Sequence, residues 1–199
     1  MALQETTILI NHTFSLAEFI IVLATSNTQV AKPIEITKVN WKKKIKEIEG
    51  PREYAGVGIM YHKDYEQAVL YYRQFSGRSV VLGLRTNSQP LIINSILAPH
   101  NATTAEGKQQ FWKQLTLEAK KHKNAIHITL GDTNTRWHCR LPGEEDILGP
   151  HIFGRGEEYL RGKMKDGDNR EFAIGYLRST GKVAINTFFQ KTRHGNSNI

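Results

Sequence analysis

The sequence predicts a mixed α+β fold in which sheets are covered by helices. Short apolar runs bounded by polar turns dominate its first half. One long amphipathic pattern follows at residues 103–122, and a further apolar run comes directly after it. Strands followed by an alternation of helix and strand favour mixed sheets over a helical bundle.

Apolar runs of strand length predict five strands before residue 100. They lie at residues 19–23, 56–61, 69–72, 79–84 and 91–97. A polar turn around Lys63 and Asp64 separates the second run from the third. The polar segment 86–90 separates the last two runs, which together are typical of a β-hairpin.

The predicted helix begins with a capping-box pattern, Thr103 with Glu106. One face carries Phe111, Leu115, Ala119 and His122. Phe111 and Trp112 are interpreted as core residues. Lysines 120, 121 and 123 lie at the carboxyl end, where cations complement the helix dipole.

Beyond this helix, the run 125–130 predicts a buried strand in which Ile126, Ile128 and Leu130 alternate and His127 faces the other side. Residues 140–169 are rich in glycine and charge and predict a long loop or lid. A shorter helix is expected at 171–177 and a last strand at 182–189.

Composition excludes several classes of protein. The 199 residues include 39% apolar residues and 16 glycines, which is ordinary for a globular domain and excludes intrinsic disorder. One cysteine, Cys139, excludes a disulfide framework or a multi-cysteine zinc site and fits a reducing compartment. The 27 Lys and Arg against 19 Asp and Glu give a net charge of +8, which points to polyanions.

No targeting or membrane-spanning segment is predicted. The most hydrophobic early run, 14–24, contains Glu18 and is too short to cross a bilayer. We therefore expect an intracellular protein without a membrane partner, and the sequence does not separate nucleus from cytoplasm. No obligate protein partner is evident.

The sharpest chemical signal is the carboxylate at the end of a predicted strand, in Gly131-Asp132-Thr133-Asn134. Strand ends of α/β scaffolds commonly present functional side chains to an open loop. Asp132 could meet a metal or accept a proton from water, and Asn134 could donate to a phosphate oxygen. A plain turn is the alternative, because Gly, Asp and Asn are common turn formers.

Several motifs occur in an order that resembles the endonuclease/exonuclease/phosphatase superfamily, which has the DNase I-like fold. They are Ala2-Leu-Gln-Glu-Thr, Gly56-Val-Gly-Ile-Met-Tyr, the strand 78–84, Ala98-Pro99 and Gly131-Asp-Thr-Asn. Later segments resemble endonuclease domains of non-LTR retrotransposons and craniofacial development protein 2-like sequences. These are 146–151, 154–157, 169–172 and 186–190. The resemblance covers nearly the whole chain except a lysine-rich stretch at 27–50, interpreted as an insertion.

The resemblance implies a single domain, 1–199, with an αββα sandwich of four layers, and metal-assisted hydrolysis of a phosphodiester in DNA. Glu5 would bind Mg²⁺, or Mn²⁺ in its place. Asp132 would orient and deprotonate the attacking water or serve the leaving group, and Asn134 would hold the phosphoryl oxygen.

The sequence also departs from the family pattern. No strand with the family's metal-site Asn precedes Glu5, no Ser-Asp-His segment follows residue 190, and Leu97 stands at a position where the family has Tyr. The sequence therefore predicts an incomplete domain, truncated at both ends, that cleaves DNA poorly or not at all.

Weaker candidates for substrate contact are His100, His151 and Arg155. Arg161, Lys163 and Lys165 continue the basic stretch after Arg155, where a solvated loop is the alternative to a DNA-backbone contact. A structural or surface role is favoured for His138 and Cys139. Two other functions remain open: a phosphatase or lipid phosphodiesterase of the same superfamily, and an inactive remnant that binds nucleic acid without sequence preference.

Overall fold

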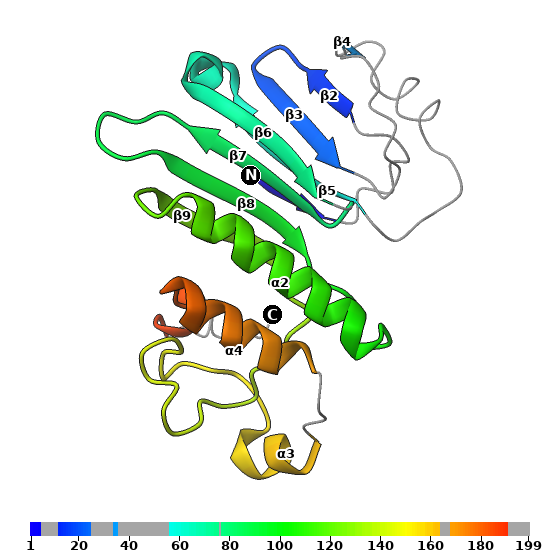
Figure 1. Cartoon of the computed structure of the whole chain (residues 1–199), viewed down its shortest axis with the longest axis vertical. Coiled ribbons are helices and arrows are strands. Elements are labelled where there is room, and N and C mark those ends of the chain that lie inside the picture. Colours follow the sequence, from blue (N-terminus) through cyan, green and yellow to red (C-terminus); the bar gives the residue numbers. More distant parts are fainter. Residues whose placement is uncertain (5–11, 25–33, 36–55, 76, 164–167, 191–199) are drawn as a thin grey trace, which may run out of the picture. The chain divides into compact units, whose positions relative to one another are not determined.

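A computed structural model describes residues 1–4, 12–24, 34–35, 56–75, 77–163 and 168–190. They form two compact units that share the chain unevenly. Unit 1 comprises Met1–Pro99 and His122–Asn134, and unit 2 comprises His100–Lys121 and Thr135–Ile199. The mixed α+β class predicted from the sequence is confirmed, with two sheets and a few helices (Figure 1). The assignment of residues 1–199 to one domain stays a prediction.

Unit 1 contains both sheets. The first has the strand order β1-β5-β3-β2-β4, and the second has the order β6-β7-β8-β9. Their bounds are β1 Ala2–Gln4, β2 His12–Ser15, β3 Phe19–Ala24, β4 Ile34–Glu35, β5 Val57–His62, β6 Val69–Phe75, β7 Ser79–Leu84, β8 Leu91–Leu97 and β9 Ile126–Asp132. A 3₁₀ helix, Lys63–Ala68, connects β5 to β6. Neighbouring strands pair antiparallel except β2 with β4 and β8 with β9, which are parallel.

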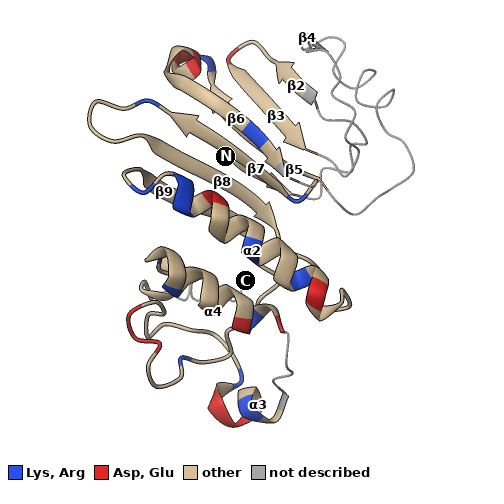
Figure 2. Ribbon diagram, in the orientation of Figure 1, with Lys and Arg blue, Asp and Glu red and all other residues tan. Residues whose placement is uncertain are grey.

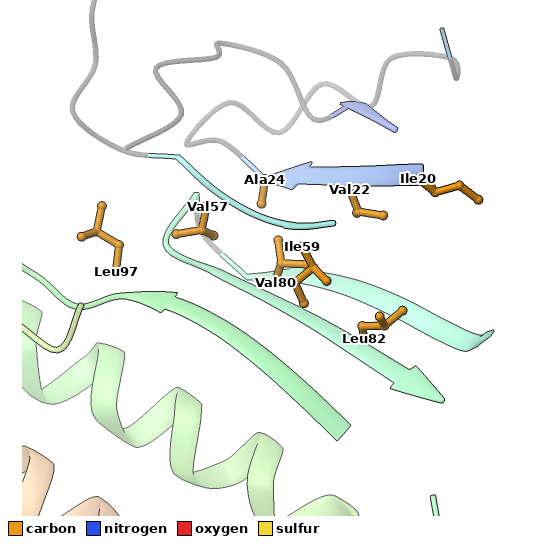
Figure 3. Close-up of a cluster of buried hydrophobic side chains, with 8 residues drawn as sticks. All are labelled: Ile20, Val22, Ala24, Val57, Ile59, Val80, Leu82 and Leu97. Atoms are coloured by element: carbon orange, nitrogen blue, oxygen red, sulfur yellow. The ribbon is translucent and has the colours of Figure 1, made fainter. Parts of the chain in front are cut away.

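The two sheets of unit 1 pack face to face through an apolar core. Side chains from both sheets point toward one another between the layers (Figure 3). The buried members are Ile20, Val22, Ala24, Val57, Ile59, Val80, Leu82 and Leu97. The β-branched and leucine side chains alternate along each strand, as expected for sheets that each bury one face against the other. Unit 1 is thus a two-sheet sandwich.

All five apolar runs predicted before residue 100 are strands, and the bounds of β7 and β8 match the prediction. The strand β2 was not expected, although it pairs with β3 in regular register. Of the predicted insertion at 27–50, only Ile34 and Glu35 lie within the described residues.

The prediction that β9 is buried is wrong. Among the described strands, β9 lies at the edge of its sheet, beside β8 only. Ile126, Ile128 and Leu130 are 49%, 42% and 40% exposed because no second neighbouring strand extends the layer beyond them. His127 is out of phase with them, as predicted, and its Nε2 lies 2.9 Å from the carbonyl oxygen of His122.

Unit 2 is built around three helices, α2 Ala105–Lys121, α3 Gly156–Lys163 and α4 Asn169–Thr180. Trp112 of α2 is 3% exposed, and its indole nitrogen donates a hydrogen bond of 3.0 Å to the Oδ1 atom of Asn169. The Trp112 ring also packs on Tyr176 of α4, at a centroid distance of 5.7 Å. The prediction that Phe111 and Trp112 are core residues is therefore confirmed.

Several elements of unit 2 differ from the prediction. The helix expected at 171–177 is present as α4, which begins at Asn169 and ends at Thr180. The cap of α2 is Thr104, whose hydroxyl accepts the Gly107 amide, because Thr103 lies one residue too early. The segment 140–169, predicted to be a long loop or lid, contains the helix α3. Residues 156–163 include Glu, Leu, Arg and Lys, which favour a helix, and they form about two turns.

The expected strand at 182–189 is replaced by a single bridge between Leu148 and Ala184 and the 3₁₀ turn η2, Ile185–Thr187. The apolar residues of the segment 182–189 are mostly exposed, so a strand here would bury little apolar surface.

Candidate functional site

The strands β8 and β9 run parallel and end together. Leu97 is opposite Asp132 in the register, and the Ala98 amide donates a 2.8 Å hydrogen bond to the Asp132 carbonyl. Their carboxyl ends therefore share one edge of the second sheet, as side chains at the ends of parallel strands generally do. Asp132 lies at this edge with an exposed side chain.

The loop after β9 is held by hydrogen bonds that also orient its side chains. The Asn134 amide donates to Oδ1 of Asp132 over 2.7 Å, which makes an Asx-type turn. Asn134 has a φ of 47°, in the left-handed region that Asn tolerates better than most residues. Its Nδ2 donates to the carbonyl oxygen of Ala98 over 2.7 Å. The side chain that was expected to hold a phosphate therefore ties the β9 loop to the end of β8.

Gly131 allows the backbones at this edge to approach closely. Its φ is 132°, and a Cβ at this position would overlap the Ile96 carbonyl oxygen. The same Cβ would lie 2.9 Å from Nε2 of Gln4, the last residue of β1. Ser95 and Leu3 join the two sheets nearby, since the Ser95 hydroxyl donates to the Leu3 carbonyl over 3.3 Å. The end of β1 thus lies beside the end of β9.

The predicted metal ligand Glu5 lies outside the described residues, directly after Gln4 in the sequence. Within the described residues, no three His, Cys, Asp or Glu side chains gather where they could hold a metal ion. Asp132 is the carboxylate that this edge presents, and an oxygen donor of this type suits Mg²⁺. A hydrated Mg²⁺ needs only one or two protein carboxylates, so the arrangement is compatible with such an ion.

The three weaker candidates for substrate contact belong to unit 2. His100 is exposed, and its Nδ1 accepts the Ala102 amide in a turn. The His151 amide donates to the Thr187 carbonyl. The guanidinium of Arg155 stacks over the Tyr159 ring at 4.8 Å. That these residues join Asp132 in one site stays a prediction.

The basic stretch after Arg155 carries charges of both signs. It forms α3, where Arg161 pairs with Glu157 at 2.6 Å and Glu158 adds a second acidic side chain in the first turn. Blue and red segments lie together on α3 in Figure 2. The side chain of Lys163 and all of Lys165 lie outside what the structure describes. The described part of this stretch is therefore less basic than its sequence suggests.

Two members of the edge were missed by the sequence analysis. Gln4 lies beside Gly131, and the Ala98 carbonyl accepts the Asn134 side chain. A backbone carbonyl has no sequence signature, so only the register of β8 and β9 reveals the second contact. Leu97 is 4% exposed and belongs to the core, which explains an apolar residue at that strand end.

Neither a comparison with known protein-family models nor one with curated proteins finds a match to this chain. No helix within the described ranges has both the length and the apolar character needed to cross a membrane.

Proposed function

We propose that the edge formed by β1, β8 and β9 is a site of Mg²⁺-dependent phosphodiester hydrolysis in DNA. The observation that carries the proposal is the meeting of Asp132, Asn134 and Gln4 at one edge of unit 1. Gln4 lies beside Gly131 and directly precedes Glu5 in the sequence, which supports a role for Glu5 at this edge. The order of motifs along the sequence, which resembles the endonuclease/exonuclease/phosphatase superfamily, supports the same assignment.

Each residue has a chemical task in this proposal. Asp132 orients and deprotonates the attacking water, using the carboxylate oxygen that does not accept the Asn134 amide. Asn134 fixes the loop through Ala98, and in this proposal a side-chain N–H of the same amide donates to a phosphate oxygen. A bound Mg²⁺ would neutralise charge that develops on the phosphate, with Glu5 and Asp132 as its proposed carboxylate ligands.

The proposed fold around this site is the αββα sandwich, which the order of motifs along the sequence supports. The proposed substrate is DNA, because the chain carries a net charge of +8. Cations bind the phosphate backbone without reading the bases, so we expect little sequence preference. We expect slow turnover, because Leu97 stands where the family has Tyr and supplies no hydroxyl group to the phosphate.

The test is a supercoiled-plasmid nicking assay with Mg²⁺ on the purified full chain. We expect slow nicking that EDTA stops and that Asp132→Asn reduces by at least about 100-fold, as loss of a general base commonly does. Asp146→Asn is the matched control, because Asp146 is exposed and lies in unit 2. Nicking that survives Asp132→Asn would contradict the proposed mechanism. Absence of nicking together with salt-sensitive DNA binding would favour the inactive nucleic-acid binder.

A further inference from the structure

Unit 2 contains a cleft with a volume of about 370 Å³, within the range of small-molecule sites. Two segments of the chain, 138–140 and 150–156, form its walls. The lining residues are His138, Cys139, Arg140, Pro150, Ile152, Gly154 and Gly156. All of them belong to unit 2, whereas Asp132 belongs to unit 1.

The lining of the cleft combines cationic and neutral donors with an apolar wall. Arg140 is exposed, and its guanidinium donates one long hydrogen bond, 3.4 Å from Nη1 to the Leu148 carbonyl oxygen. A guanidinium has five N–H donors, so most of them remain for a ligand. Of the described residues that line the cleft, none is Asp or Glu. The chemistry of the walls therefore suits an anion.

The Cys139 thiol is compatible with an anionic ligand. Burial raises the pKa of this thiol above its ordinary value; Arg170 and Arg161 act in the opposite direction, and Glu157 and Glu144 raise it further. The side chain therefore stays neutral near pH 7 and does not repel a negative group. It remains a weak S–H donor at the cleft wall.

The backbone at His138 is strained and is held from several sides. Its φ of 57° is uncommon for a residue with a side chain. Gly154 packs so closely against His138 that a Cβ would overlap the His138 backbone. Behind this segment, the buried Arg170 donates to the Trp137 and Cys139 carbonyls over 3.3 and 3.2 Å. Strain that the surroundings hold in place is common at ligand clamps, because it fixes a side chain before the ligand arrives.

The imidazole of His138 is positioned by an aromatic neighbour. Its ring packs edge-on against Tyr159, with centroids 4.9 Å apart. Arg155 covers the same Tyr159 ring, at 4.8 Å from its centroid. The contact with Tyr159 restricts the position of the imidazole, which lines the cleft.

We propose that this cleft binds a phosphate group through Arg140 and His138. A guanidinium matches two phosphate oxygens with two parallel N–H donors, and an imidazole can donate to a third. Pro150 and Ile152 would contact an apolar or aromatic group attached to the phosphate. The phosphate can come from a small phosphorylated molecule or from a nucleic-acid backbone. The proposal does not depend on hydrolysis at Asp132.

The test is an NMR titration of the ¹⁵N-labelled full chain with inorganic phosphate, followed at the Arg140 side chain and the Cys139 amide. Sodium chloride at equal ionic strength is the reference. We expect saturable shifts with phosphate, weakened about tenfold or more by Arg140→Gln because the bidentate charged contact is lost. Arg136→Gln is the matched control, since Arg136 is exposed, nearby in sequence and outside the cleft. It should change the affinity by less than about twofold, as expected for a screened surface charge.

A second variant tests the histidine without disturbing the backbone. Asn tolerates the left-handed conformation, so His138→Asn should keep the fold and weaken phosphate binding. Adenosine monophosphate and a short single-stranded oligonucleotide then distinguish the two phosphate sources by which one binds more tightly. Equal weakening by Arg140→Gln and Arg136→Gln, or equal shifts with chloride, would overturn the proposal.

Discussion

The buried ion pair of unit 2 gives a prediction that can be worked out from its contacts. Arg170 and Glu144 are 4% and 7% exposed, and the guanidinium makes two hydrogen bonds to the carboxylate, at 2.8 and 2.6 Å. The guanidinium also donates to the Trp137 and Cys139 carbonyls. Arg170 therefore joins α4 to the segment 137–144 through four hydrogen bonds.

Replacing Arg170 with Met removes all of these donors and leaves the Glu144 carboxylate buried without a cation. Breaking one partner of a buried pair typically costs about 3–5 kcal/mol of the free energy of unfolding. For a chain of 199 residues, each kcal/mol lowers the Tm by about 2–4 °C, so we expect a decrease of roughly 6–20 °C. The measurement is thermal unfolding followed by circular dichroism.

The matched control is Arg161→Met, which breaks an exposed pair of similar length. Arg161 and Glu157 are 63% and 49% exposed, so solvent already screens their attraction. The expected cost is about 0.3–0.5 kcal/mol, as for other helical pairs four residues apart. The double variant Arg170→Met with Glu144→Met should be more stable than Arg170→Met alone, because it leaves no buried charge. Equal stabilities of Arg170→Met and Arg161→Met would refute this reasoning.

Three further results are expected. Gly131→Ala should destabilise unit 1 by about 3 kcal/mol or more in chemical denaturation, because the φ at this position is unfavourable for alanine and the added Cβ would overlap the Ile96 carbonyl oxygen. The control is Gly175→Ala, which should not destabilise the chain because the space around its Cβ is open. Trp112→Phe should cost about 1–2 kcal/mol in the same assay by removing the donor to Asn169, and an unchanged midpoint would show that this bond contributes little. Iodoacetamide should alkylate Cys139 more slowly at pH 8 than it alkylates a free cysteine, because the raised pKa keeps the thiol protonated. The rate should rise as the pH increases above 8. A rate equal to that of free cysteine would contradict the burial argument.

The strands of unit 1 were predictable because their apolar runs end at clear turn residues. The run 79–84 is flanked by Arg78 and Arg85, and Pro90 precedes the run 91–97, so the bounds of β7 and β8 follow from the sequence. β9 shows the limit of this approach. Its alternation of Ile126, Ile128 and Leu130 predicts a strand correctly, yet the pattern cannot distinguish a central strand from an edge strand.

The candidate site was predictable in part for a similar reason. A Gly-Asp-Thr-Asn segment after a strand indicates where a carboxylate emerges, and the structure places Asp132 at that strand end. The tether from Asn134 to Ala98 and the approach of Gln4 to Gly131 depend on the register of β8 with β9 and on the packing of two sheets. These are long-range relations, so no local pattern in the sequence contains them.

The central claim, a metal-dependent site at the edge of β8 and β9, can be tested by paramagnetic broadening. Mn²⁺ replaces Mg²⁺ at oxygen sites and broadens NMR signals close to it. Added at a low ratio to the ¹⁵N-labelled chain, it should broaden the amides of Gln4 and of Gly131 to Asn134 first and leave Leu91, at the opposite end of β8, sharp. Asp132→Asn should remove this selectivity. Broadening centred instead on the acidic first turn of α3, at Glu157 and Glu158, or unchanged by Asp132→Asn, would contradict the account.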